Sequence, residues 1–372
     1  MASFPLLFQL GSVEEKLLWT AVFTVALTGL GFVLVSIAIG RMSLSNLEMS
    51  FVERVIICTS LGIALLMLLS VYLNYTIFGM TSTSIRVLCV LLIIVSATAI
   101  GRIRLTVRRG IGHRHLRNLT YRSCRTESRW PLLTLPIAVS LLAITLVLPQ
   151  IIPYKYFGML DPYMIAPLVR YILEERALPT LSYWEAPFTG MYGFNGFFYL
   201  MALIHQASGV SLYTMTRFGG AIFISIVALV LFFLSFRASN SLTVSTLTVI
   251  FYVTSYDIVH RFSMTLREDL VLFLGLALLY CVGMARAEHR QNIWYAFCSL
   301  MVASIFSSHS LVFMFVALVF ALLVLLDMAR LRRAFAERHI KIEVKFLLLS
   351  FIVGLLIAGV YLPAQLYTIV FE

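Results

Sequence analysis

Long hydrophobic runs separated by short polar segments make up most of the chain. Many of these runs are about 17–25 residues long, which is enough for an α-helix to cross a hydrocarbon core about 30 Å thick. The strands of a membrane barrel would instead be about 9–11 residues long and would alternate in polarity. We therefore predict an all-α polytopic membrane protein. Its transmembrane helices, about ten in number, are expected near residues 17–40, 55–78, 84–101, 131–152, 214–236, 241–258, 270–286, 292–308, 310–327 and 346–369.

The amino-acid composition supports this class of protein and excludes two others. Of the 372 residues, 61% are hydrophobic and 12% are charged. A soluble domain is about 45–50% apolar and about 25% charged, so this chain fits neither a soluble enzyme nor a disordered protein. The five cysteines include no C-x-x-C pair, which argues against a zinc or redox site built from cysteine.

The distribution of positive charge predicts which loops face the cytoplasm. The formal net charge is +11, and lysine and arginine gather on the cytoplasmic side of membrane proteins. The segment 102–129 contains nine arginines and a single acidic residue, Glu127, so we predict that it is cytoplasmic. Alternation then puts 41–54, the turn at Arg237, 286–291 and 329–345 inside, and 79–83, 153–213, 257–269 and the turn at His309 outside.

The same arginine-rich segment raises the question of a nucleic-acid partner. It has few interleaved aromatic residues, and no nucleic-acid-binding motif accompanies it. We therefore expect it to contact anionic membrane lipids rather than nucleic acid.

Two segments of the first outer loop are predicted to form helices at the membrane surface. In 161–175, the apolar residues share one helical face while Arg170, Glu174 and Glu175 face water. The apolar run 194–209 is short for a span and begins among glycines. We interpret it as a juxtamembrane or re-entrant helix at the outer surface.

Charged residues gather in the predicted outer loops rather than in the spans. Charges near the bilayer are costly and therefore tend to be functional. A secondary transporter would place them within the spans, often on interrupted helices, whereas these spans carry almost none apart from Arg86. The pattern favours a catalyst that works at the membrane surface.

These outer residues carry a resemblance to a known family. The run YFGMLDPYMIAPLVRYILEERALPTLSYWEAPFTG, followed by an apolar helix and then TMTRFGG, resembles the first outer loop of the GT-C glycosyltransferases. This superfamily includes protein O-mannosyltransferases, lipid A aminoarabinose transferases and the catalytic subunit of oligosaccharyltransferase. In the family an acidic residue follows the first core span, some branches have a Glu-x-Pro element, and an arginine opens the next span. Asp161, Glu185 and Arg217 match these positions.

The second outer loop extends the resemblance. The run HRFSMTLREDLVLF is similar to an oligosaccharyltransferase loop in which an arginine precedes an acidic residue by seven positions, and Arg261 and Glu268 have this spacing. The likeness covers about 131–369 and implies a GT-C-like core of seven spans within 131–372. A three-span region with the basic loop, 1–130, precedes it. No WWDYG-type element is present, which argues against a peptide-glycosylating oligosaccharyltransferase.

The resemblance implies a membrane glycosyltransferase. It would move a sugar from a polyprenyl-phosphate carrier, such as dolichyl phosphate, to an acceptor on the non-cytoplasmic face of the cell membrane. Asp161 would act as the base or would position the acceptor hydroxyl. Arg261, helped by Arg217, would hold the carrier phosphate, because guanidinium keeps its charge and offers forked donors.

Further residues are implied in binding. Glu185 would bind hydroxyl groups of the sugar or the acceptor, and His309 would contact the phosphate. Glu268 and Asp269 would either join Asp161 around a divalent cation, Mg²⁺ or Mn²⁺, or orient the neighbouring arginine. No other cofactor is expected.

Simpler interpretations of the same residues stay open. Asp161 before proline is a typical helix cap, and Arg261 fits a side chain that anchors a helix end at the interface. Glu268 and Asp269 fit acidic residues favoured by a helix N-terminus, and His309 fits a solvated turn better than a phosphate contact. The alternative functions are a non-catalytic GT-C-like assembly subunit and a lipid or solute transporter.

Overall fold

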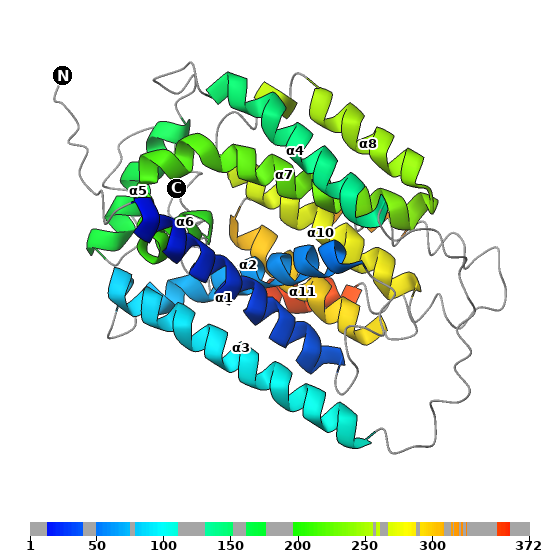
Figure 1. Ribbon diagram of the computed structural model, residues 1–372, viewed down its shortest axis with the longest axis horizontal. Coiled ribbons are helices and arrows are strands. Elements are labelled where there is room, and N and C mark those ends of the chain that lie inside the picture. Colours follow the sequence, from blue (N-terminus) through cyan, green and yellow to red (C-terminus); the bar gives the residue numbers. More distant parts are fainter. Residues whose placement is uncertain are drawn as a thin grey trace.

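The computed structural model describes residues 13–39, 50–74, 79–110, 131–151, 161–175, 196–255, 258–260, 267–287, 291–308 and 348–357, with a few positions between 314 and 325. Over these residues the protein is helical and contains no strand. The helices shown in Figure 1 are α1 (Val13–Ile39), α2 (Phe51–Asn74), α3 (Ser82–Gly110), α4 (Pro131–Ile151), α5 (Asp161–Glu175), α6 (Gly196–Ser208), α7 (Leu212–Ser239), α8 (Leu242–Thr254), α10 (Arg267–Ala287) and α11 (Gln291–Ser308).

Within the described residues, six helices are long and apolar enough to cross a membrane: α1, α2, α3, α4, α7 and α10. Three shorter apolar helices accompany them, over Leu242–Thr254, Trp294–Ser308 and Leu348–Ile357. The chain is therefore an integral membrane protein of the predicted all-α class. The predicted number of about ten spans is not confirmed, because within the described residues the helices at 241–258 and 292–308 are shorter than a full span. Most of 310–327 and the end of 346–369 lie outside the described residues.

The long helices alternate in direction between two ends of the bundle. At one end, which we call the α6 end, Arg86 at the start of α3 pairs with Glu15 at the start of α1, with Nη1 and Oε1 2.7 Å apart. At the same end, Ser82 at the start of α3 donates a hydrogen bond to Gln206 of α6. At the opposite end, which we call the Glu53 end, Arg237 near the end of α7 pairs with Glu53 at the start of α2. Helices α5 and α6 lie together at the α6 end (Figure 1).

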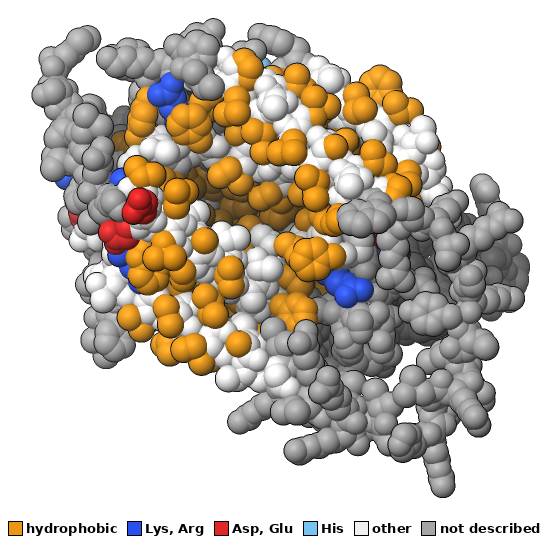
Figure 2. All heavy atoms as spheres, in the orientation of Figure 1, with side chains coloured by type: hydrophobic (Ala, Val, Ile, Leu, Met, Phe, Trp, Pro, Cys, Tyr) orange, Lys and Arg blue, Asp and Glu red, His pale blue; other side chains and the backbone are white. Residues whose placement is uncertain are grey.

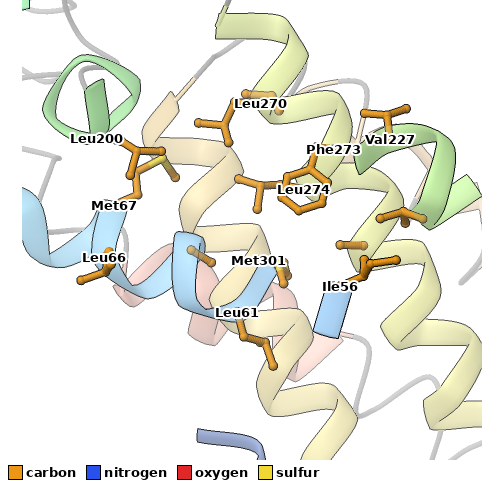
Figure 3. Close-up of a cluster of buried hydrophobic side chains, with 14 of the residues drawn as sticks. Ile56, Leu61, Leu66, Met67, Leu200, Val227, Leu270, Phe273, Leu274 and Met301 are labelled. Atoms are coloured by element: carbon orange, nitrogen blue, oxygen red, sulfur yellow. The ribbon is translucent and has the colours of Figure 1, made fainter. Parts of the chain in front are cut away.

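Helix α2 occupies the middle of the bundle. It packs against α1 on one side and against α6, α7, α10 and α11 on others. Apolar side chains from these helices form one buried core, part of which is drawn in Figure 3: Ile56, Leu61, Leu66 and Met67 of α2, Leu200 of α6, Val227 of α7, Leu270, Phe273 and Leu274 of α10, and Met301 of α11. The first three spans and the helices after residue 131 therefore share a single hydrophobic core.

Glycines allow α1 and α2 to approach closely. A Cβ added at Gly31 of α1 would lie 1.7 Å from the carbonyl oxygen of Cys58, and one added at Gly62 of α2 would lie 2.2 Å from that of Leu27. Each glycine thus faces a carbonyl four residues before the partner glycine, as in the close helix pairs that small residues form in membranes. Between these contacts, the hydroxyl groups of Thr28 and Thr59 are 3.1 Å apart and form a hydrogen bond.

Candidate functional site

The structure describes four of the seven predicted site residues, one of them only by its backbone. Asp161 is the first residue of α5, and its side chain lies outside the described residues, so its capping role stays a prediction. Arg217, Glu268 and Asp269 are described with their side chains. Glu185, Arg261 and His309 lie outside the described residues.

Helix α5 has the amphipathic character that its sequence predicts. Ile165, Leu168, Val169 and Ile172 are buried, whereas Arg170 and Glu174 are exposed and form an ion pair four residues apart. The apolar face packs against α6 and α7. Helix α5 therefore covers the α6 end of the bundle and begins with Asp161 there.

Helix α6 is enclosed on nearly all sides. Eleven of its 13 residues are buried, and it packs against α1, α2, α3, α5 and α11. Gly196, its first residue, allows the backbone to approach α11, because a Cβ there would lie 3.0 Å from the carbonyl oxygen of Ser307. Of the two arrangements left open by the sequence, this burial favours a short helix inserted into the bundle over one that lies flat on its surface.

A histidine side chain bonds to the backbone just after the end of α6. The Nδ1 atom of His205 lies 2.6 Å from the Val210 carbonyl oxygen. Because a carbonyl oxygen only accepts, Nδ1 is the protonated nitrogen in this arrangement. The side chain is buried, and burial lowers its pKa below the usual 6.5, while the hydrogen bond to Val210 partly opposes this shift.

Arg217 connects the start of α7 to the end of α4. Its Nη2 donates to the carbonyl oxygen of Ile151 at 3.1 Å, and its Nη1 donates to the hydroxyl of Tyr213 at 3.2 Å. The guanidinium also lies 5.5 Å from the ring centre of Phe218, within the range of a cation–π contact. These contacts hold one positive charge in a fixed place at the α6 end.

Glu268 and Asp269 lie in the first turn of α10. Helices α10 and α11 pack side by side and are joined by residues 288–290, so the start of α10 lies beside the end of α11. That end contacts Gly196 of α6, which places both acidic residues at the α6 end. Asp269 is fully buried, whereas Glu268 is half-buried.

These two carboxylates do not form a metal site by themselves. Consecutive residues on a helix point in different directions, and no group of three His, Cys, Asp or Glu side chains able to hold a metal ion occurs among the described residues. The predicted third ligand, Asp161, has a side chain outside that set. The implied Mg²⁺ or Mn²⁺ therefore stays a prediction.

A hollow opens on the side of the bundle. Figure 2 shows it between helices α7 and α1, and hydrophobic side chains line it. Because its walls are apolar, an extended hydrocarbon chain is the chemistry that it matches. The hollow runs along the same helices, α1 and α7, whose first residues lie at the α6 end.

An ionic cluster at the Glu53 end is not among the predicted sites. Glu53 is buried and accepts hydrogen bonds from Arg237 and from the Tyr280 hydroxyl of α10. One signal for it is present in the sequence, because Ser50 and Glu53 form a capping box, in which each residue's backbone N–H donates to the other's side chain. The pairing with residues of α7 and α10 follows only from the tertiary structure.

Comparison of the chain with protein-family models, with curated proteins and with solved structures finds no match.

Proposed function

We propose that this protein is a membrane glycosyltransferase that takes a sugar from a polyprenyl-phosphate carrier and passes it to an acceptor on the non-cytoplasmic face. The observation that carries the proposal is the grouping at the α6 end. There α5, which begins at Asp161, packs against α6 and α7, and the fixed charge of Arg217 and the acidic start of α10 lie at the same end. The apolar hollow beside α7 supports it, because a long hydrocarbon carrier needs such a groove.

The proposed reaction needs a base and a positive charge. The acceptor hydroxyl oxygen attacks the anomeric carbon of the sugar while the bond from that carbon to the phosphate oxygen breaks. The phosphate leaves with the bonding electron pair, and the hydroxyl proton passes to the carboxylate of Asp161. Arginine stabilises the departing phosphate, because its charge persists and its donors are forked.

Within this proposal, the predicted site residues have distinct tasks. Arg217 is held by Ile151 and Tyr213, so its charge would be in place before the carrier phosphate binds. Arg261 would contact the phosphate directly, and Glu185 would bind hydroxyl groups. Asp269 is buried in the bundle, which suits a residue that positions its neighbours better than one that binds a sugar.

A transfer assay with a matched control tests the proposal. Purified Asp161→Asn protein in lipid vesicles is given polyprenyl-phosphate sugars and a mixture of acceptors, and glycosidic product is measured. The control is Glu174→Gln, because Glu174 lies on the same helix, is exposed and pairs only locally with Arg170. We expect Asp161→Asn to lose about 100-fold or more of the transfer rate, which is typical for a general base, while Glu174→Gln keeps it.

Other outcomes identify the alternatives. Wild-type transfer by Asp161→Asn removes Asp161 from its role. No transfer by the wild type, together with movement of the labelled carrier between the leaflets, favours a transporter. Absence of both activities until another subunit is added favours the non-catalytic assembly subunit.

A further inference from the structure

The carboxylate of Glu53 is fully engaged in hydrogen bonds. Its Oε1 accepts from Nε of Arg237 at 2.8 Å and from the Tyr280 hydroxyl. Its Oε2 accepts from Nη2 of Arg237 at 3.0 Å and from the backbone N–H of Ser50 at 3.0 Å. A carboxylate has about four lone-pair sites, so these four donors occupy it.

This saturation excludes several roles for Glu53. A carboxylate with four donors has no lone pair left for a metal ion or for an incoming proton, so it is poorly suited to act as a metal ligand or as a base. The buried charge is instead compensated by a bidentate arginine, which is the strong form of such a pair. The role of the Glu53 carboxylate is therefore structural, because its hydrogen bonds join α2 to α7 and α10.

The cluster has an asymmetric exposure. The side chain of Glu53 is 3% exposed, whereas that of Arg237 is 31% exposed. Arg237 therefore covers the buried carboxylate from the surface of the bundle and can reach water when the pair separates. The core beside α2, α7 and α10 contains apolar side chains such as Ile56, Val227 and Leu274 (Figure 3), and contacts of this kind are not directional.

We propose that Glu53, Arg237 and Tyr280 form a conformational latch. The latch holds the unit of α1, α2 and α3 against α7 and α10 at the Glu53 end, and its release widens the hollow between α1 and α7 from that end. Helices α1 and α3 follow α2, because α1 packs closely on α2 and α3 packs closely on α1. The latch stands independently of the proposed transferase activity, since it depends only on the contacts of α2.

Native cysteines on both sides of the latch report its state. Cys58 lies on α2 five residues after Glu53, and Cys281 follows Tyr280 on α10, and both are buried. Cys89 on α3 is also buried but lies towards the α6 end. Alkylation of each thiol by N-ethylmaleimide in lipid nanodiscs, followed residue by residue by mass spectrometry, measures the local opening of each site.

The test variant is Glu53→Gln, and its control is Ser50→Ala. Glu53→Gln keeps the side-chain volume but removes the charge that pairs with Arg237. Ser50→Ala removes the hydroxyl that caps α2 but keeps the bonds of Glu53 to Arg237 and Tyr280. For Glu53→Gln we expect alkylation of Cys58 and Cys281 to rise roughly tenfold or more while that of Cys89 is unchanged, because labelling follows the population of the open form. Ser50→Ala is expected to leave all three rates unchanged.

A second variant keeps the test decisive if Glu53→Gln fails to fold. Tyr280→Phe removes the α10 hydroxyl that bonds Glu53 and interacts with Arg237, while the Glu53–Arg237 pair between α2 and α7 stays. We therefore expect a rise in alkylation at Cys281 that exceeds the rise at Cys58. Rates equal to those of the wild type in every variant that folds would overturn the latch. A uniform rise that includes Cys89 would also overturn it, because it would mean loss of the whole fold rather than opening at one end.

Discussion

Replacing Gly31 by alanine tests the close packing of α1 and α2. In the wild type, an alanine Cβ at this position would lie 1.7 Å from the Cys58 carbonyl oxygen. The shortest separation that real Cβ atoms tolerate is 3.0 Å, so the helices must move apart by 3.0 − 1.7 = 1.3 Å. A movement of this size along the line between Thr28 and Thr59 would stretch their 3.1 Å hydrogen bond beyond 3.5 Å, the longest donor–acceptor distance of a hydrogen bond.

The size of the effect follows from two opposing contributions. Alanine in place of glycine favours a helix by about 0.5–1 kcal/mol. Overpacking of a tight interface costs about 1–3 kcal/mol. We therefore expect Gly31→Ala to lower the free energy of unfolding by about 1–2 kcal/mol, although the substitution improves the intrinsic helix propensity.

Matched glycines on other helices serve as controls. A Cβ at Gly101 of α3 or at Gly283 of α10 would meet no atom within 4 Å. Gly101→Ala and Gly283→Ala should therefore be neutral or should stabilise the protein by up to about 1 kcal/mol. The assay is denaturant unfolding in detergent micelles, followed by tryptophan fluorescence. Equal effects of Gly31→Ala and Gly283→Ala would refute the reasoning.

Gly62, the glycine on α2, allows a second test of the close contact between α1 and α2. Gly62→Ala meets the carbonyl oxygen of Leu27 at 2.2 Å, so the same separation of the helices relieves both contacts. The double variant Gly31→Ala/Gly62→Ala should therefore cost less than the sum of the single variants. Full additivity would mean that the two glycines act at independent sites.

Two further predictions concern buried polar groups. The folded protein disfavours protonated His205, whereas the unfolded chain protonates this residue near pH 6.5. The unfolded state therefore binds more protons in acid, and the stability of the fold should fall as the pH is lowered from about 7.5 to 5.5. His205→Gln should make the melting temperature less dependent on pH over this range. An unchanged pH dependence in this variant would contradict the prediction. The Ser304 hydroxyl of α11 shares its proton between the Ala64 carbonyl oxygen of α2 at 3.0 Å and the Leu300 carbonyl oxygen of its own helix at 2.9 Å. Ser304→Ala should therefore cost about 0.5–1 kcal/mol of unfolding free energy. Thr248→Ala, which removes an exposed bond within α8, should cost less in the same denaturant titration. A larger loss there would argue against the interhelical bond.

The hydrophobic pattern predicts the helices well, because burial in a membrane is recorded directly in the length of apolar runs. The predicted start of α4 at residue 131 is correct, as is the amphipathic face of α5. The pattern did not predict that α6 is enclosed by the bundle. An apolar helix of 13 residues has the same composition whether protein or lipid surrounds it, so its neighbours are needed to tell the two apart.

The candidate site was less accessible to sequence reasoning than the fold. Arg217 was correctly recognised as an arginine at the start of a span, but its contacts with Ile151 and Tyr213 depend on how α4 meets α7. The burial of Glu53 is not predicted, because the residue stands at the edge of a predicted cytoplasmic loop, where an acidic side chain is expected to face water. Its burial arises from the approach of α7 and α10, which are separated from it by 184 and 227 residues at the contacting positions.

These long separations constrain the biogenesis of the protein. Glu53 is synthesised 184 residues before Arg237 and 227 residues before Tyr280, so the carboxylate emerges from the ribosome well before either donor exists. Its place in the first turn of α2 lets interfacial water solvate it during that interval, whereas the same charge at the centre of the helix would face hydrocarbon. Membrane insertion of the early helices can thus proceed at once, while their final docking waits for the translation of α10.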